Sequence, residues 1–294
     1  MILRGCGTAL VTPFRSDGSL DEETLSKLVE WQIESGIHFL VACGTTAETP
    51  TLNHEEWLRV IGIVCQTAAG RVPVVAGCTH NATLEAVARA GEAASVPGVS
   101  GLLTANPFYN KPSQEGLFRH YSAIAEATDL PIILYSIPSR CGVEIGLPLV
   151  ERLRSKYSHV RWIKEAGGSV DRVDQFKRAL GDDIVVLSGD DSLTLAFMAA
   201  GAEGVISVAS NVVPRHIARL VRLMRENDVA RASELHRRLY PLYRALFIEP
   251  SPVPVKAALA IARIIGSEAV RLPLCRMEPA NRAILARALA ALRR

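Results

Sequence analysis

The chain has 294 residues, of which 49% are hydrophobic and 21% are charged. This composition supplies the core of one large domain and argues against a disordered chain. The net charge of +3, without a long run of lysine or arginine, argues against a nucleic-acid-binding surface. No stretch approaches the roughly 18 apolar residues of a membrane-spanning helix, and glycine and proline interrupt the N-terminus too early for a signal peptide, so we expect a cytoplasmic protein.

Eight short runs rich in apolar and β-branched residues are expected to be buried strands. They span residues 8–11, 39–42, 72–76, 101–104, 132–135, 160–164, 184–187 and 204–208. Stretches with helical spacing lie between most of them, and Asp21 is the expected N-cap of the first. The apolar stripe of that helix comprises Leu25, Leu28, Val29, Gln32 and Ile33. A second expected stripe comprises Leu84, Val87, Ala88 and Gly91.

Alternating strands and amphipathic helices predict parallel β/α units, and eight such units fit a closed (β/α)8 TIM barrel. An open doubly wound sheet would need a glycine-rich phosphate loop after its first strand. Thr-Pro-Phe follows the first run instead, and no dinucleotide-binding or Walker motif occurs. From residue 214 onward only helical periodicity remains. We therefore predict an α/β protein with a barrel catalytic domain over residues 1–224 and a C-terminal helical domain over residues 225–294.

Lys164 ends the sixth run, and in such barrels the chemistry lies at the carboxyl ends of the strands. A lysine that is desolvated at the barrel mouth holds its proton less tightly. Its neutral amine is then a nucleophile toward a carbonyl carbon. The structural alternative is an ion pair with the neighbouring Glu165 at the barrel rim, and position alone does not decide between the two roles.

Other polar side chains follow neighbouring strands. Tyr135 ends the fifth run, where its phenol can exchange protons with an adduct on Lys164 or can simply cap the core. Thr45 and Thr46 follow a glycine after the second run, and they can either receive a carboxylate or form an ordinary turn. Arg140 lies beyond Tyr135 and suits a substrate carboxylate, although a plain surface arginine fits its position as well.

The remaining polar candidates are less specific. Tyr109 lies in a loop rich in asparagine and proline, where it is either a relay hydroxyl or an interface residue. Asp190 and Asp191 are expected to be helix N-caps, and Lys256, in a proline-rich segment, is expected to be structural. The histidines are not spaced as a metal-ligand set, so we expect no metal.

An ordered series of motifs along nearly the whole chain resembles the dihydrodipicolinate synthase / N-acetylneuraminate lyase family of class I aldolases. The motifs are residues 9–13 (ALVTP), 44–48 (GTTAE), 52–54 (LNH), 106–116 (NPFYNKPSQEG), 135–142 (YSIPSRCG), 163–166 (IKEA), 187–191 (LSGDD), 204–207 (GVIS) and 249–256 (EPSPVPVK). The resemblance implies a (β/α)8 fold. It also implies that pyruvate is bound covalently as a Schiff base and that no metal or organic cofactor is needed.

The resemblance assigns catalytic roles to four of these residues. Lys164 matches the Schiff-base lysine, and Tyr135 matches the residue that donates and accepts protons. Thr45 and Tyr109 match the other two hydroxyls of the family's proton relay. In the family, that tyrosine reaches across a dimer interface, and the resemblance implies a homotetramer built as a dimer of dimers.

Three further residues match substrate-binding positions. Thr46 matches the residue that binds the pyruvate carboxylate, and Ile206 matches a residue on the eighth strand that contacts pyruvate. Arg140 matches the arginine that binds the carboxylate of L-aspartate 4-semialdehyde in the synthase branch, whereas the sialic-acid lyase branch usually has a non-basic residue there. We therefore expect condensation of pyruvate with this aldehyde to give 4-hydroxy-tetrahydrodipicolinate, in the diaminopimelate and lysine pathway.

Three other functions stay open. One is cleavage of N-acetylneuraminate or a related 2-keto acid, another is a different branch of pyruvate-dependent aldolases, and the third is a non-catalytic regulatory homologue that binds a metabolite. The chain departs from the family pattern at Ser136 and Cys141, which replace asparagine and threonine, and at 168–169. Ala47 replaces a usual glycine, and it is strained if the loop needs a left-handed residue there.

A possible effector site is also implied, because His54, Asn81 and Glu85 match positions at which L-lysine binds some family members. Three positions differ from the sensitive members: Pro50, Trp57 and Phe108. Proline has no backbone N–H to donate, and the phenylalanine replaces a tyrosine and its hydroxyl. Each missing polar partner weakens the binding of a buried lysine. We therefore expect L-lysine to inhibit weakly or not at all.

Overall fold

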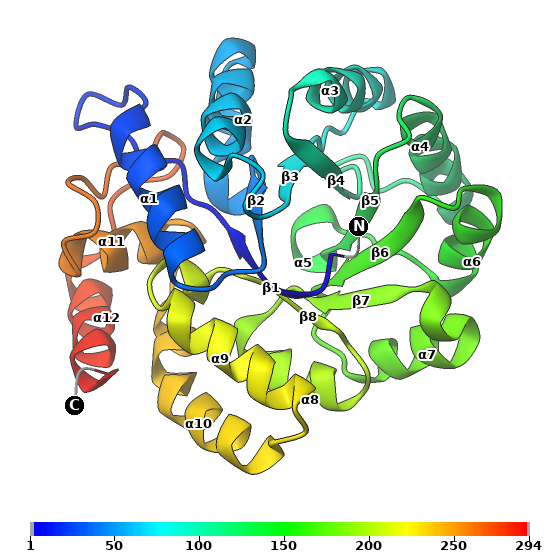
Figure 1. Cartoon of the computed structure of the whole chain (residues 1–294). Helices are drawn as coiled ribbons and strands as arrows, with labels where there is room; N and C mark the ends of the chain where they lie inside the picture. Colours follow the sequence, from blue (N-terminus) through cyan, green and yellow to red (C-terminus); the bar gives the residue numbers. More distant parts are fainter. Residues whose placement is uncertain (1–2, 293–294) are drawn as a thin grey trace.

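Eight parallel strands close into a barrel in the computed structural model, which describes residues 3–292 (Figure 1). Each strand pairs with the next one in the chain, and the last pairs with the first. The strands are β1 (Gly5–Ala9), β2 (Phe39–Ala42), β3 (Val74–Gly77), β4 (Val99–Ala105), β5 (Ile132–Ser136), β6 (Val160–Glu165), β7 (Val185–Ser188) and β8 (Gly204–Ser207). The predicted (β/α)8 barrel is confirmed.

Helices surround the barrel on the outside (Figure 1). They are α1 (Glu22–Glu34), α2 (His54–Ala68), α3 (Thr83–Ser95), α4 (Gln114–Glu126), α6 (Leu147–Lys156), α7 (Asp171–Leu180), α8 (Thr194–Ala199) and α9 (Pro214–Arg225). The short helix α5 (Pro138–Cys141) directly follows β5 and lies inside this ring in Figure 1. Three more helices follow the last barrel unit: α10 (Val229–Ala245), α11 (Val253–Ile261) and α12 (Pro279–Leu292). Within residues 3–292, no helix combines the length and the apolar character needed to span a bilayer.

All eight predicted strands are present, but β1 begins earlier than the apolar run at 8–11 indicated. The preceding glycines hide this start, because glycine carries no strand-forming side chain. At Gly204 on β8, an added Cβ would lie 1.9 Å from the carbonyl oxygen of Gly5. Glycine is therefore required where the first and last strands meet and close the barrel.

The first helix follows the prediction. Asp21 is its N-cap, and its carboxylate accepts a hydrogen bond of 3.1 Å from the backbone N–H of Thr24. Gln32 is fully buried on the inner face, yet its amide is satisfied. The amide donates to the carbonyl of Ser210 at 2.9 Å and accepts from the hydroxyl of Thr8 at 2.7 Å. These contacts join α1 to β1 and to the turn after β8.

The buried face of α3 differs from the prediction. Leu84 was expected to face the core, but 84% of its side chain is exposed. The buried residues are Ala86, Ala90 and Ala93, which pack α3 against β4 and α4. Alanine lets a helix approach its neighbours closely, while the larger and more apolar leucine and valine suggested a different face.

The C-terminal helices form one group beside α9. The helix α10 packs on both α9 and α12, and α11 packs on α12 and on the turn at Ala209–Asn211 after β8. The predicted helical C-terminal region is therefore present. The predicted boundary at residues 224 and 225 falls at the end of α9, and it stays a prediction.

Candidate active site

The direction of Lys164 follows from the alternation of side chains along β6. Trp162 belongs to the cluster inside the barrel, whereas Ile163 packs with the residues between the barrel and its helices. Lys164 therefore turns inward again at the carboxyl end of the strand, with 5% of its surface exposed. This placement leaves the amine largely desolvated at the mouth of the barrel.

The pKa of Lys164 is lowered to about 8: burial lowers it most, the charge of Asp191 opposes this, and the charge of Arg140 adds to it. At pH 7 this pKa leaves about a tenth of the amine neutral, compared with on the order of one part in 2,500 for an ordinary lysine. Within residues 3–292 the amine has no ion-pair partner. Lys164 can therefore act as a nucleophile near neutral pH.

The structural alternative for Lys164 is wrong, because Glu165 faces the other side of the strand. Its carboxylate accepts a hydrogen bond of 2.6 Å from the backbone N–H of Gly167. It also lies 3.4 Å from the guanidinium of Arg172. The neighbouring carboxylate is thus satisfied elsewhere and does not neutralise the lysine.

Tyr135 stands beside Lys164 on the adjacent strand, and the two residues are partners in the β5–β6 register. The Lys164 Nζ lies 4.2 Å from the centroid of the Tyr135 ring. Burial raises the pKa of the Tyr135 phenol, while the charge of Arg140 and a hydrogen bond with the side chain of Thr45 oppose this rise. The phenol is therefore protonated at neutral pH and can donate a proton. Tyr135, Lys164, Thr45 and Arg140 form one electrostatic group.

Thr45 and Thr46 lie in a short 3₁₀ turn, η1 (Thr45–Ala47), directly after β2. Thr46 is buried, and Ala47 does not adopt positive φ. The left-handed residue is Glu48, with φ of 56°. The strain considered for Ala47 is therefore absent. The residue with left-handed backbone conformation lies one position later than the glycine of the family pattern suggested.

Arg140 lies in the short helix α5 above the end of β5. One of its amino groups donates to the carbonyl of Ser251 at 3.2 Å. Its side chain lines a cavity of about 390 Å³, which is also lined by Thr45, Ile137 and Cys141. The 44–48 loop and the guanidinium of Arg140 therefore line the same cavity. This guanidinium is suited to binding an anionic group of a ligand.

Gly189 provides room beside the lysine. An added Cβ there would lie 2.6 Å from the Cβ of Ala166 and 3.2 Å from the Cε of Lys164. The Gly189 backbone N–H also donates to the carbonyl of Glu165 at 2.7 Å, which holds the loop after β7 close to β6. A side chain at this position would press on the lysine stem.

The two aspartates after β7 have different partners. Asp190 is an N-cap as predicted, and its carboxylate accepts from the backbone N–H of Ser192 at 2.7 Å. The buried Asp191 instead accepts from the N–H groups of Val208 and Ala209, at 3.0 and 2.9 Å. It therefore caps the turn after β8 and not a helix of its own, which corrects the N-cap prediction for this residue.

The other two predicted site residues lie in different surroundings. Ile206 is fully buried inside the barrel, in the same apolar cluster as Tyr135. Tyr109 is 90% exposed and adopts a left-handed backbone with φ of 72°. The structure of the single chain therefore brings together Lys164, Tyr135, Thr45 and Arg140, but leaves Tyr109 pointing to solvent.

The predicted effector residues lie in the following surroundings in the single chain. His54 stacks on Trp57 and lies 3.4 Å from the carboxylate of Glu92. The backbone carbonyl of Asn81 accepts from the side chain of Asn110 at 2.8 Å, which ties it to the loop that carries Tyr109. Glu85 is exposed near the start of α3.

The sequence interpretation missed Arg89, a residue of α3 that lines the same cavity as Arg140. Its guanidinium carbon lies 5.6 Å from the ring centroid of Trp57. The sequence could have indicated Arg89 only if the buried face of α3 had been identified correctly. Arg89 directly precedes Ala90, which belongs to that face. The effector region thus contains a cation that the prediction did not include.

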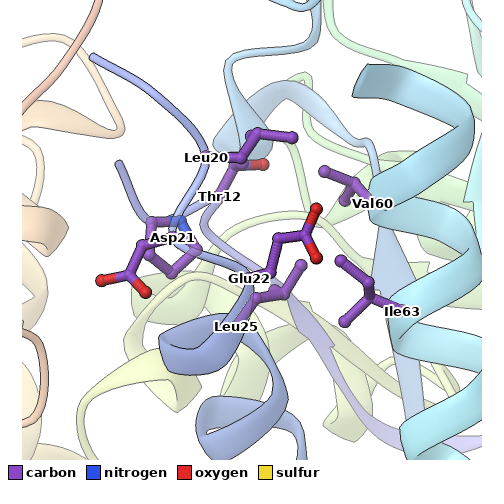
Figure 2. A pocket seen from close by; sticks show the side chains of 8 residues that line it. Thr12, Leu20, Asp21, Glu22, Leu25, Val60 and Ile63 are labelled. Carbon is purple, nitrogen blue, oxygen red and sulfur yellow. The ribbon is translucent and has the colours of Figure 1, made fainter. Parts of the chain in front are cut away.

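A second hollow lies between the N-terminus of α1 and α2 (Figure 2). Figure 2 shows Glu22 beside the apolar side chains of Leu25, Val60 and Ile63, while the carboxylate of Asp21 points away from them. The volume of this hollow is close to 0 Å³, so the hollow is a packing gap and has no room for a ligand.

Comparison with known proteins agrees with this geometry. The family model of the Dihydrodipicolinate synthetase family matches residues 2–292. A 4-hydroxy-tetrahydrodipicolinate synthase from Acidobacterium capsulatum is 52% identical over 287 residues, covering 98% of this chain and 95% of the relative.

Solved structures of similar proteins have the same fold. The 4-hydroxy-tetrahydrodipicolinate synthase of Methylacidiphilum fumariolicum SolV is 47% identical, with a TM-score of 0.97 and coverage of 99% of this chain and 96% of that chain. A chloride-inhibited dihydrodipicolinate synthase of Acinetobacter baumannii complexed with pyruvate is 38% identical, with a TM-score of 0.96 and 99% coverage of both chains. This chain therefore belongs to the dihydrodipicolinate synthetase family.

Proposed function

We propose that this enzyme condenses pyruvate with L-aspartate 4-semialdehyde to form 4-hydroxy-tetrahydrodipicolinate, in lysine and diaminopimelate biosynthesis. Relatives that match nearly the full chain carry the name of this synthase. The observation that carries the proposal is the buried Lys164 amine, which has a lowered pKa and lies beside the Tyr135 phenol. A relative solved with pyruvate supports the choice of the first substrate.

The reaction begins when the neutral amine of Lys164 attacks the carbonyl carbon of pyruvate. Tyr135 supplies a proton to the departing oxygen, so that water leaves and an iminium ion remains. The iminium withdraws electrons, and the methyl group loses a proton to give an enamine. The enamine carbon then bonds to the aldehyde carbon, and the amino group of the bound aldehyde attacks the iminium carbon and releases Lys164. No metal or organic cofactor takes part in these steps.

The substrate carboxylates are assigned to two places. Thr45 and Thr46 offer hydroxyl and backbone N–H groups after β2, and we assign the pyruvate carboxylate to this loop, with Ile206 as its apolar contact. Arg140 lines the cavity, and its guanidinium can bind the carboxylate of the semialdehyde with two parallel hydrogen bonds.

Tyr109 completes the proposed site from a second copy of the chain. Its side chain is almost fully exposed in the single chain, while the cavity that Thr45 lines is open. A tyrosine from a partner would add the third hydroxyl of the proton relay. We therefore propose a homotetramer assembled as a dimer of dimers, with each tight dimer forming complete sites.

We further propose that L-lysine inhibits this enzyme weakly or not at all. Arg89 places a positive charge in the cavity wall next to Trp57, among residues of the expected effector region. The ammonium groups of lysine would meet this charge, and Pro50 in the same wall has no N–H to donate. Titration of L-lysine in the activity assay tests this, and inhibition that saturates below about a millimolar would contradict it.

An assay of product formation from pyruvate and the semialdehyde tests the proposed function, with pyruvate release from N-acetylneuraminate as the comparison. We expect activity in the first assay and none in the second. Cleavage of N-acetylneuraminate as the faster reaction would assign the chain to the lyase branch. Failure in both assays, together with tight binding of pyruvate, would favour a regulatory homologue.

A further inference from the structure

A second buried lysine lies far along the chain from Lys164. Burial lowers the pKa of Lys256 to about 8 as well. Lys256, however, is ion-paired: its Nζ donates to the carboxylate of Glu48 at 2.5 Å, and neither side chain is exposed. Unlike Lys164, Lys256 has its amine occupied by a carboxylate, so we do not expect it to be the reactive amine, and its function is left to be explained.

Glu48 connects two consecutive turns in the loop that carries Thr45. Its backbone N–H donates to the carbonyl of Thr45 at 3.2 Å, and its own carbonyl accepts from Thr51 at 2.8 Å. Between these two turns Glu48 adopts a left-handed conformation, which is unfavourable for a residue with a Cβ. Such a conformation persists only where surrounding contacts hold it.

The contacts that hold Glu48 come from the C-terminal part of the chain. Besides Lys256 on α11, the backbone N–H of Arg271 donates to its carboxylate at 2.9 Å. The ring of Phe14 lies against both cations, with its centroid 4.1 Å from Lys256 Nζ and 4.3 Å from the guanidinium carbon of Arg271. Arg271 in turn binds Glu56 at the start of α2 through two hydrogen bonds of 2.6 Å.

Stability alone is a weak explanation for this arrangement. A buried ion pair must overcome the desolvation of both charges, and apolar residues of similar size often stabilise a protein as well or better. The pair does, however, fix the direction of the Glu48 carboxylate relative to two elements that are distant in sequence. Such a contact is suited to setting the geometry of the loop.

We infer that Glu48 and Lys256 are positioning residues for pyruvate: their buried pair fixes the 44–48 loop against α11 and so orients Thr45 and Thr46 toward the pyruvate carboxylate. The inference rests on the proposed assignment of that carboxylate to this loop. Arg140 lies on a different loop, so the pair acts mainly on pyruvate, although the Ser251 carbonyl that accepts from Arg140 lies just before α11.

The test compares Glu48→Gln, Lys256→Met and the double variant with wild type in steady-state assays of both substrates. We expect the KM for pyruvate to rise about tenfold or more in each, since a small misplacement of binding groups is costly. The kcat at saturating pyruvate should fall by a smaller factor than the KM for pyruvate rises, because Thr45 also belongs to the proposed proton relay, and the KM for the semialdehyde should change least. Arg282→Met is the control, because it breaks a half-buried pair with Glu268 in the same C-terminal region, away from the 44–48 loop in sequence.

Thermal unfolding separates positioning from stability. The single variants leave one buried charge unpaired and should melt at a lower temperature, whereas the double variant removes both charges and should recover. Positioning predicts that the double variant still has the raised KM for pyruvate. If Lys256→Met does not fold, Glu48→Gln, which keeps the shape of the side chain, decides the matter. A KM for pyruvate within twofold of wild type in the folded variants would overturn the inference.

Borohydride trapping distinguishes this result from a failure of the proposed function. If wild type forms no pyruvate adduct on Lys164, the proposed function itself is wrong. If wild type is trapped and the variants reach half-maximal trapping at the same pyruvate concentration, only the positioning inference is wrong. We expect the variants to form the same adduct at pyruvate concentrations about tenfold higher or more.

Discussion

Burial and nearby charges both act on the proton of Lys164. Because the neutral amine is the nucleophile and its pKa is about 8, the rate of pyruvate trapping at subsaturating pyruvate should rise about tenfold per pH unit below this value. Above pH 8 the rate should level off, since the amine is then already neutral. Measuring the trapping rate from pH 6 to 10 checks this, and a continued rise to pH 10 would indicate an ordinary lysine.

Arg140 should affect both the aldehyde and the lysine. Arg140→Ala removes a charge-assisted contact of about 2–4 kcal/mol, so kcat/KM for the semialdehyde should fall roughly 30- to 1000-fold. The lost positive charge no longer disfavours protonated Lys164, so the pH at which trapping levels off should move upward. Arg140→Lys is the matched control, because it keeps the charge without the two-pronged geometry. Unchanged semialdehyde kinetics in the alanine variant would reject the assignment.

Single residues differ in how far the sequence could place them. Lys164, Tyr135 and Thr45 could be predicted to lie together, because each follows an apolar run and parallel strands end at one face of the barrel. The buried pair of Glu48 and Lys256 could not, because its members are 208 residues apart in sequence. The residues next to Glu48 and next to Lys256 in the sequence do not indicate that either side chain is buried against an opposite charge.

The loop after β7 allows a test at the level of an element. Gly189→Ala adds a Cβ within 3.2 Å of the Lys164 Cε, so we expect slower trapping at all pyruvate concentrations. Gly62→Ala is the control: a Cβ there meets no atom within 4 Å, and in the middle of α2 alanine should stabilise the protein by about 0.5–1 kcal/mol. Kinetics measured alongside thermal unfolding check both, and wild-type trapping in Gly189→Ala would show that the loop yields easily.

Elements with strong apolar runs were predicted well, and elements of small residues were not. The start of β1 was missed because glycine carries no pattern, although glycine is what lets β1 and β8 meet. The inner face of α3 was missed because its buried residues are alanines, while Leu84 is exposed. Periodicity identifies these elements but does not say which neighbours they touch.

For the whole molecule, the proposal that Tyr109 completes the site of a partner can be tested by mixing two variants. Lys164→Ala lacks the nucleophile, and Tyr109→Ala lacks the relay hydroxyl. A mixed dimer contains one site with Lys164 from one chain and Tyr109 from the other. We expect mixtures that are unfolded and refolded together to gain activity above the sum of the separate variants. Activity equal to that sum would place Tyr109 outside the partner's site.

The barrel as a whole could be predicted because eight strand runs alternate with helical stretches along the chain. The assembly could not be derived in this way. Tyr109 is exposed in a single chain, and no local pattern shows which surface a second copy would cover. Only the family resemblance indicated its role, and the mixed-variant experiment is the direct check.

The proposed reaction depends on Lys164 as the amine that binds pyruvate. Borohydride reduction of the full-length protein with pyruvate, followed by peptide mass mapping, measures this most directly. We expect a single reduced pyruvate adduct on Lys164, absent without pyruvate and absent in Lys164→Arg. An adduct on Lys256, whose pKa is also lowered to about 8, or no adduct at all, would contradict it.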